Sequence, residues 1–278
     1  MKKNIRMNIR KILIVFTALF QNFVVAQINE NQKAFSKITY QIRYGSDTIK
    51  DEKVDWADYV LLFNDKNSVF YSEEAFNFYG FIDKKAIEMK NSGGVNLGVM
   101  PKAPRHKTAL TKMGDLLYAY MPIGRNIFSY KEPPLKWEVL GENKKIKNYD
   151  CILAKTTTDT DNVFYAWFTP QISVPEGPFR FKGLPGLVIE IYNERKTIKI
   201  FANEIEKSST QMVNIKFPKV VALEDRKDKF LKAREQFILN PNQQYDDANI
   251  KIYDTNTGKE LKSKLKTNPN LTSKDLLD

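Results

Sequence analysis

Short stretches that alternate between apolar and polar residues, with turn formers between them, constrain the fold more than any other feature of this sequence. The signal is densest between residues 137 and 192. The stretches that alternate, or that are rich in aromatic and β-branched residues, lie at residues 137–140, 149–155, 163–169, 187–192 and 197–204. Because short turns join antiparallel neighbours, this succession predicts an antiparallel sheet.

The region before residue 137 contains more strands of the same kind. Ile38, Tyr40, Ile42 and Tyr44 alternate with polar residues, which is the period of a half-buried strand. Further strands are predicted at residues 59–63, 69–71, 116–121 and 128–130, the first two forming a hairpin around the turn at residues 64–67. Between residues 83 and 112 the glycines and prolines predict a long loop, which contains the only histidine, His106.

A helical period replaces the strand period near the C-terminus. Apolar residues recur on one face of a helix predicted over residues 223–239, which Asn240 and Pro241 end. The predicted fold class is therefore mainly β, a β-rich α+β chain with a single antiparallel curved sheet or a partly open barrel and one C-terminal amphipathic helix. The domain is expected to cover residues 27–255, and the polar tail at residues 256–278 is expected to be frayed.

A tight turn precedes the strand predicted at residues 187–192. The turn consists of Gly183, Leu184, Pro185, Gly186 and Leu187. Proline fixes its φ at about −65°, and glycine can adopt the positive φ that the third position of a type II turn requires. We therefore expect a structural type II turn over residues 184–187, with the positive φ at Gly186.

The first 26 residues predict an export signal. Five basic residues precede an apolar stretch at residues 12–25, and the small residues that end at Ala26 predict cleavage before Gln27. A membrane anchor is the alternative, but Gln21 and Asn22 interrupt the apolar stretch, which is shorter than the roughly 20 residues that span a bilayer. The mature chain is expected in the periplasm or at the cell surface, without a transmembrane anchor.

Removal of this signal lowers the net charge of the chain. The signal takes five of the 44 basic residues and none of the 33 acidic ones, which leaves 39 against 33, or +6. The remaining lysines are spread along the chain and form no arginine-rich groove, so no nucleic-acid partner is expected. Attraction to anionic lipid or lipopolysaccharide is a secondary alternative.

Few residues could hold a metal ion or act as a nucleophile. With one histidine and one cysteine, Cys151, the chain cannot build a zinc site on several imidazoles or thiolates, and it cannot form an internal disulfide. No G-x-S-x-G motif accompanies His106, which is expected to be a solvated loop residue. Cys151 lies on an alternating strand and is expected to be a buried small hydrophobe. We expect neither a metal nor a cofactor.

Paired carboxylates are the remaining candidates for catalysis. They occur at Glu73-Glu74, at Asp159 and Asp161, and at Asp246-Asp247. Adjacent residues on a strand point to opposite faces, and Asp in a turn usually bonds its own backbone, so none of these is expected to be a catalytic pair. A hydrolase whose carboxylates converge only in the fold is an alternative, which two buried carboxylates facing one cleft would favour.

Three aromatic residues are the candidate ligand-binding residues: Trp137, Trp167 and Phe168. Aromatic residues on such strands either line a cavity or fill the core of the sheet. We expect Trp137 to pack in the core. For Trp167 a cavity is the hypothesis, because this residue precedes a Gly/Pro-rich loop at whose edge a pocket would open.

The sequence around the turn resembles the GLPGLI family. Residues 183–188 resemble the motif that names this family, with Val188 in place of its final isoleucine. Trp137-Glu138-Val139, Ile146, Tyr149, Cys151 and Ala154 resemble its upstream segment, although Asn148 stands where glycine is expected. The run before the motif is matched by Ala166-Trp167-Phe168-Thr169, Ile172 and Gly177-Pro178. The resemblance implies an exported protein of outer-membrane-bearing bacteria, and it implies no active site.

These observations favour an exported, non-catalytic envelope protein. The leading hypothesis is binding of an apolar or peptide-like ligand, or of an envelope partner, on a curved sheet. A structural or assembly role is the second hypothesis, and a large exposed apolar patch would favour it. The carboxylate hydrolase is the third.

Overall fold

The computed structural model describes residues 34, 36–45, 55–94, 98–102, 104, 106–123, 126–206, 222–224, 226–240, 252–253 and 260–261. Its strands are β1 (Ser36–Tyr44), β2 (Asp55–Phe63), β3 (Asn67–Ser72), β4 (Ala109–Met113), β5 (Leu116–Ile123), β6 (Asn126–Glu132), β7 (Trp137–Ile146), β8 (Tyr149–Thr157), β9 (Val163–Thr169), β10 (Leu187–Asn193), β11 (Ile198–Glu206), β12 (Ala222–Glu224), β13 (Ile252–Tyr253) and β14 (Glu260–Leu261). Its helices are α2 (Glu73–Ser92) and α3 (Lys227–Leu239). The predicted export signal lies outside the described residues.

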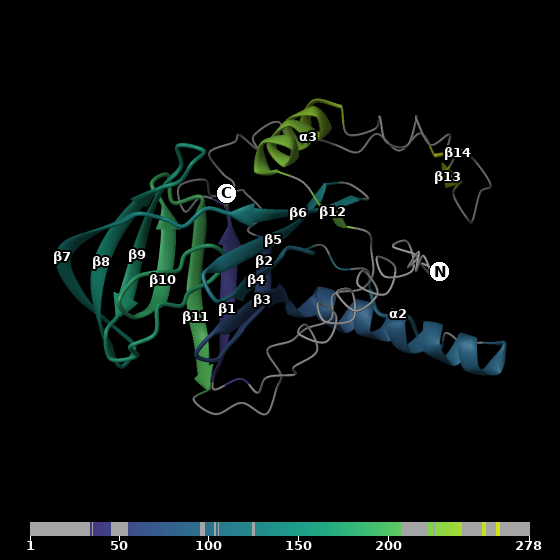
Figure 1. The fold of residues 1–278 in the computed structure, drawn as a ribbon, viewed down its shortest axis with the longest axis horizontal. Helices are drawn as coiled ribbons and strands as arrows, with labels where there is room; N and C mark the ends of the chain where they lie inside the picture. Colours follow the sequence, from purple (N-terminus) through teal and green to yellow (C-terminus); the bar gives the residue numbers. More distant parts are fainter. Residues whose placement is uncertain are drawn as a thin grey trace, which may run out of the picture.

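One curved sheet dominates the molecule (Figure 1). Its twelve strands follow the order β12-β6-β5-β4-β3-β2-β1-β11-β10-β9-β8-β7. All neighbours are antiparallel except β12, which pairs in parallel with β6. The predicted antiparallel sheet is thus confirmed, and in the described part of the chain the sheet is not closed, since β12 and β7 form its two ends. β13 and β14 form a separate pair.

The alternation predicted for the first strand is confirmed. In β1, Ile38, Tyr40 and Ile42 point to one face of the sheet, and each is at most 1% exposed. We call this face the inner face and the opposite one the outer face. Cross-strand pairing extends the inner face through Leu61 of β2 and Phe70 of β3. Most buried apolar side chains belong to the cluster on this face, so the main core lies there.

Two segments cover the inner face. Residues 172–188, which we call the motif segment, cross it between β9 and β10 and bury Phe179, Phe181 and Leu184. The helix α3 lies over the other end of the sheet, where Phe230 packs on Tyr130 of β6 with ring centroids 4.8 Å apart. The sheet therefore buries its inner face against its own chain.

The loop predicted over residues 83–112 is wrong at both of its ends. The helix α2 continues to Ser92, and β4 begins at Ala109. Glu73 and Glu74, expected on a strand, instead form the first turn of α2, where acidic residues favour a helix start. Gly93, with a φ of 72°, ends the helix, and its N–H donates to the Met89 carbonyl at 2.9 Å. The helix was missed because only Ala75 of its residues is buried.

The N-cap of α2 gives a first testable prediction. The Ser72 hydroxyl accepts a hydrogen bond from the Ala75 N–H at 3.4 Å. Ser72→Ala should lower the free energy of unfolding by about 1 kcal/mol, because the helix loses this acceptor. Chemical denaturation measures the change, and Asn77→Ala, on the exposed surface of α2, is the control. Equal midpoints for Ser72→Ala and the wild type would show that the hydroxyl does not cap the helix.

The C-terminal region differs from the prediction in its boundaries. The helix was predicted from residue 223, but Leu223 lies in β12 and α3 begins at Lys227. Its amphipathic character stays a prediction. Of the tail predicted to be frayed, Glu260 and Leu261 form β14, and the rest lies outside the described residues. Among the described residues, no helix is long and apolar enough to span a membrane.

Candidate functional site

The motif segment is held on the inner face by aromatic contacts. Phe179 has a positive φ of 49°, which is rare for a bulky residue and indicates local strain. Its ring packs against both Tyr59 and Phe70, with centroids 5.2 and 4.6 Å away, and these two rings stack on each other at 4.9 Å. Phe181 packs on Phe164 of β9 at 4.7 Å. These contacts bury the segment deeply enough to hold a strained backbone in place.

The motif forms a turn, but the prediction of a type II conformation is wrong. The positive φ, 94°, belongs to Gly183, and Gly186 has no positive φ. The Gly186 N–H donates to the Leu184 carbonyl at 2.8 Å, which makes a three-residue γ-turn centred on Pro185. Gly186 is required for a different reason, because a Cβ there would lie 2.3 Å from the Thr169 carbonyl oxygen. Close packing on the end of β9, and not φ, selects glycine at this position.

A buried charge cluster fixes the middle of the motif segment. Glu176, 3% exposed, accepts hydrogen bonds from Lys182 Nζ at 2.5 Å and from Lys112 Nζ of β4 at 2.8 Å. Burial alone would raise the pKa of Glu176, but the two lysine charges outweigh it and hold that pKa below its ordinary value. Burial lowers the pKa of Lys182, and Glu176 opposes only part of that effect.

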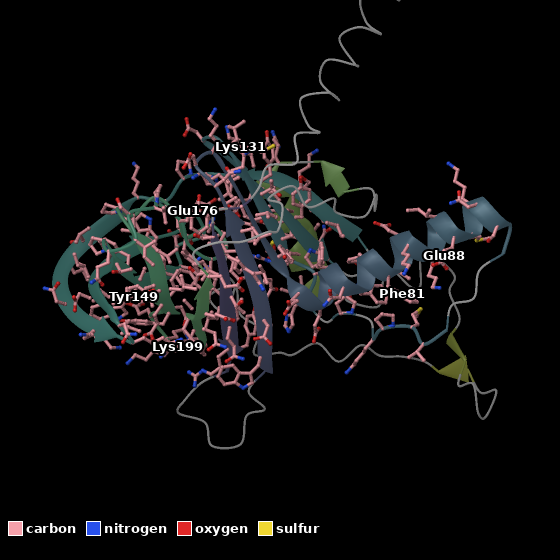
Figure 2. The ribbon with its side chains drawn as sticks, turned by 90° about the horizontal axis from the view of Figure 1, so that it is seen from below. Phe81, Glu88, Lys131, Tyr149, Glu176 and Lys199 are labelled. Carbon is pink, nitrogen blue, oxygen red and sulfur yellow. The ribbon has the colours of Figure 1, made fainter. Side chains whose placement is uncertain are left out.

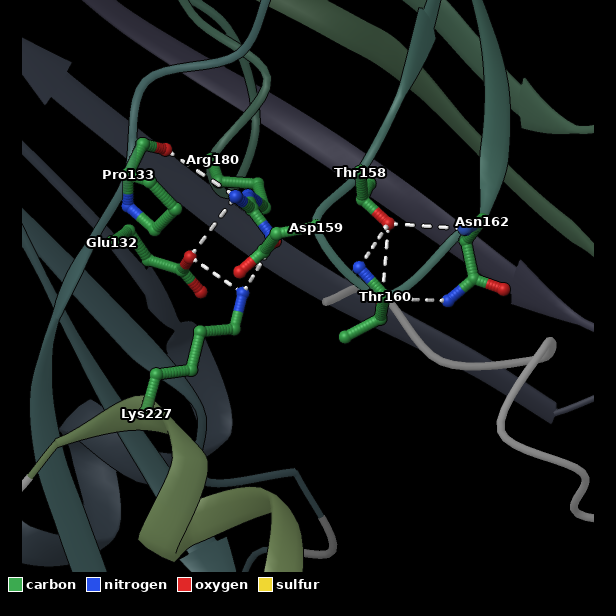
Figure 3. A network of polar contacts seen from close by, with 8 residues as sticks. All are labelled: Glu132, Pro133, Thr158, Asp159, Thr160, Asn162, Arg180 and Lys227. Carbon is green, nitrogen blue, oxygen red and sulfur yellow. Dashed lines mark hydrogen bonds and ion pairs between the residues drawn. The ribbon is translucent and has the colours of Figure 1, made fainter.

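A second charge cluster joins the motif segment to α3 (Figure 3). Arg180 lies 3.2 Å from Glu132 at the end of β6 and 2.6 Å from Asp159 in the turn between β8 and β9. Lys227, the first residue of α3, lies 2.9 Å from both carboxylates. The four side chains therefore connect four parts of the chain that are far apart in sequence.

The two carboxylates of this second cluster have opposite pKa shifts. Burial raises the pKa of Glu132, and the nearby charges of Arg180 and Lys227 offset only part of that rise. Burial also acts to raise the pKa of Asp159, but hydrogen bonds from Lys227 and Arg180 outweigh it and lower that pKa. Asp159 is more exposed, with 37% of its side chain accessible, which explains the weaker effect of burial.

Hydrogen bonds within the turn between β8 and β9 hold Asp159 in place. The Thr158 N–H donates to the Asn162 carbonyl at 2.9 Å, and the Asn162 N–H donates to the Thr158 hydroxyl at 3.1 Å. Asp161 adopts a positive φ of 60°. Residues 159–162 thus form a turn, in which the side chain of Asp159 makes the ion pairs.

Both clusters consist of carboxylates that are paired with cations of the same chain. Glu176 is shared by two lysines, and Glu132 and Asp159 are shared by Arg180 and Lys227. Each of these carboxylates bonds two cations from separate parts of the chain, so the ion pairs hold those parts together. Among the described residues, no group of three or more His, Cys, Asp or Glu side chains could hold a metal ion.

The structure does not bring the three predicted aromatic residues together. Phe168, 1% exposed, faces the inner core, whereas Trp167, 8% exposed, faces outward below Lys144, whose Nζ lies 5.5 Å from the Trp167 ring. Trp137 is half-buried near Phe181, and its Nε1 donates to the Lys182 carbonyl at 2.9 Å. Neighbouring residues on a strand alternate between faces, so this separation was readable from the sequence. A ligand-binding role for these residues stays a prediction.

The hydrogen bond of Trp137 gives a second testable prediction. Trp137→Phe should lower the free energy of unfolding by about 1–2 kcal/mol, because the Lys182 carbonyl loses its donor in a partly buried position. Trp56→Phe, at a side chain that is 45% exposed, should change it by less than about 0.5 kcal/mol. Thermal or chemical unfolding measures both changes, and equal effects would mean that the indole contact adds no stability.

Cys151 and His106, the single cysteine and the single histidine, both pack against other residues. Cys151 is 1% exposed and free, and burial raises the pKa of its thiol to about 11, as expected of a buried small hydrophobe. His106 stacks on Tyr44 with ring centroids 5.6 Å apart, so it packs on β1 and is not merely solvated. Asp246 and Asp247 lie outside the described residues. The two charge clusters were missed because no local pattern pairs residues so far apart in sequence.

Comparison with solved structures finds remote likenesses. PNGF-II, solved in space group C2, gives a TM-score of 0.46 at 14% identity, over 72% of this chain and 32% of PNGF-II. This chain thus spans about a third of the length of PNGF-II. An uncharacterised conserved protein of Thermus thermophilus gives 0.34 at 6% identity, over 74% of this chain and 98% of that one. A LolA superfamily protein of Nitrosomonas europaea gives 0.26 at 10% identity, over 64% and 86%.

Comparison by sequence is more specific, although it is local. No curated protein matches the chain. One family model, described as a protein of unknown function (Porph_ging), matches residues 156–190, which run from the end of β8 through the motif segment. The finer resemblance to the GLPGLI family stays a prediction. Over the segment that fills its inner face, the chain is therefore similar to an uncharacterised protein family.

Proposed function

We propose that the protein is an exported, non-catalytic protein of the cell envelope that binds a partner protein through α2. The predicted signal at residues 1–26 supports export to the periplasm or cell surface. The clamped carboxylates support a role in binding over one in catalysis, because both charge clusters stabilise the motif segment. The observation that carries the proposal is the exposed apolar stripe of α2, which consists of Tyr79, Ile82, Ala86 and Met89.

This helix projects from the sheet with little of its surface covered. Figure 2 shows α2 extending away from the strands, with Phe81 and Glu88 along its length. Several large apolar side chains of α2 are at least 37% exposed: Phe76, Ile82, Ile87 and Met89. Exposed apolar residues concentrated on one element mark an interaction site more often than single exposed ones do.

The spacing of apolar residues on α2 indicates what the partner presents. Tyr79, Ile82, Ala86 and Met89, which are partly or fully exposed, follow one another at alternating steps of three and four residues. Residues at these steps form the seam along which two helices pack side by side. The seam is flanked by one acidic and two basic residues, Asp83, Lys85 and Lys90. A partner helix that carries both acidic and basic residues could pair with them. The proposed occupant is therefore an amphipathic helix of an envelope protein.

Site-specific photo-crosslinking in the producing cell tests this proposal. A photoreactive residue in place of Ile82, on the seam, should give one discrete product with a partner protein, and the crosslinked peptide should have apolar residues at steps of three and four. The same residue in place of Lys84, on the opposite side of α2, should give no such product. Equal products from both positions, no product, or a product only with a second copy of this chain would each refute the proposal.

An accessory role in envelope assembly is the second candidate function. The same exposed apolar stripe favours it, because an assembly factor also binds its client through such a surface. The crosslinking experiment separates the two roles in a pulse–chase format. A resident partner keeps its crosslink after synthesis stops, whereas a client loses it as assembly is completed.

A further inference from the structure

The outer face of the sheet carries a row of cationic and aromatic side chains. Cross-strand pairing places one residue from each of six neighbouring strands in line. From β8 to β2 the row consists of Lys155, Tyr165, Tyr192, Lys199, Arg43 and Trp56. Five of these side chains are half-buried and Trp56 is exposed, so the row lies at the surface. With strands about 4.8 Å apart, it extends over about 24 Å.

The two tyrosines of the row stack on each other and offer their hydroxyls to a ligand. The Tyr165 and Tyr192 rings stack on each other, with centroids 5.4 Å apart and planes inclined by 14°. Lys155 Nζ lies over the Tyr165 ring, 5.9 Å from its centroid. Neither phenol hydroxyl has a hydrogen-bond partner among the described residues. Burial, with a smaller effect of Glu190, raises the pKa of Tyr192, so its hydroxyl stays a donor.

The row carries three positive charges and no negative one. The adjacent row on the same face contains two acids, and both have partners. Glu190 lies 3.3 Å from Lys199 and 4.0 Å from Lys144, and Asp58 accepts a hydrogen bond from Gln41. Lys155 has no ion pair among the described residues. Lys144 and Lys199 share the single carboxylate of Glu190, so with Lys155 this part of the surface keeps a positive charge that is complementary to a negatively charged ligand.

We propose that this row binds an acidic polysaccharide. Ammonium groups form strong hydrogen bonds with carboxylates, and free phenol hydroxyls can bond the many hydroxyls of a sugar chain. The exposed Trp56 adds an apolar surface at one end of the row. A single-stranded nucleic acid fits less well, because its bases need free aromatic faces, whereas Tyr165 is covered by Tyr192 and Lys155 and one face of Tyr192 is covered by Tyr165. An open sheet face suits an extended polymer.

Equilibrium binding to alginate, a polymer of uronic acids, tests this inference on the mature chain. Alginate should bind with an affinity that falls as salt rises, and neutral dextran should not bind. Lys155→Gln with Lys199→Gln should weaken alginate binding about tenfold. Tyr165→Phe with Tyr192→Phe keeps the stacked rings and should weaken it about threefold. Lys84→Gln with Lys90→Gln, on α2, is the matched control and should leave the affinity unchanged.

Three results would overturn the inference. The first is that the wild type does not bind alginate. The second is an equal loss of affinity in the α2 control, which would indicate attraction by net charge alone. The third is tighter binding of a single-stranded oligothymidylate than of alginate, which would indicate a nucleic-acid surface. Failure of the α2 crosslink would leave these measurements unaffected, because the row and α2 are separate surfaces.

Discussion

Replacing Glu176 by glutamine should lower the free energy of unfolding by about 3–5 kcal/mol, because the substitution leaves Lys182 buried without its counter-charge. Lys182 is 8% exposed, so water cannot replace the carboxylate. Lys112 is less affected, since 23% of its side chain is accessible. Urea denaturation at neutral pH measures the change. Glu206→Gln, which breaks the exposed pair with Lys37, is the control and should change stability by less than about 1 kcal/mol.

The pH dependence of this effect follows from the sign of the pKa shift. The pKa of Glu176 is lower in the folded protein than its ordinary value of 4.5. The carboxylate therefore contributes stability above pH 4.5, and this contribution is lost as the pH falls through the folded-state pKa. The difference between wild type and Glu176→Gln should be largest near neutral pH and should shrink below about pH 4. A constant difference across this range would mean that Glu176 is not ionised in the folded protein.

Replacing both Glu176 and Lys182 by apolar residues separates the effect of the unpaired charge on stability from the effect of side-chain packing. Glu176→Leu with Lys182→Met removes both charges and keeps most of the side-chain volume. Buried ion pairs replaced in this way often lose little stability. The double variant should therefore be more stable than Glu176→Gln. A double variant as unstable as the single one would show that the exact hydrogen bonds, and not the unpaired charge, determine the loss.

Gly186→Val should lower the free energy of unfolding by about 3 kcal/mol or more. A Cβ at this position would lie 2.3 Å from the Thr169 carbonyl oxygen and 2.7 Å from its carbon, so β9 and the turn would have to separate. Gly80→Ala is the control, because nothing lies within 4 Å of a Cβ there and alanine favours a helix by about 1 kcal/mol. Denaturation midpoints measure both. An unchanged midpoint for Gly186→Val would contradict the close packing of the turn on β9.

The strands were predictable because their signal is local. The alternation around Tyr40 depends only on which face each side chain points to, and the hairpin of β2 and β3 depends on the turn formers at residues 64–67. The conformation of the Pro185-Gly186 turn was not predictable in the same way. Pro-Gly indicates a turn, but the contact between Gly186 and Thr169 decides its backbone conformation, and that contact exists only once β9 and β10 pair.

The helix α2 shows how a correct local signal can be overlooked. Ser72, the two glutamates after it and Gly93 are the start and stop signals of a helix. Almost none of its apolar residues packs on the core, so no buried face indicated a helix. The charge clusters lacked any local signal. Glu176 and Lys112 are 64 residues apart, and Glu132 and Lys227 are 95 apart, so only the strand order brings them together.

Hydrogen exchange of the backbone amides in residues 172–188 tests most directly whether the motif segment is a fixed part of the core. If the charge clusters and aromatic contacts clamp it, its hydrogen-bonded amides, such as those of Phe181 and Gly183, should exchange only with global unfolding, at the same free energy as the amides of β9 and β10. Exchange of these amides by a local opening, at a clearly lower free energy than β9, would show that the segment moves on the sheet and would contradict this account.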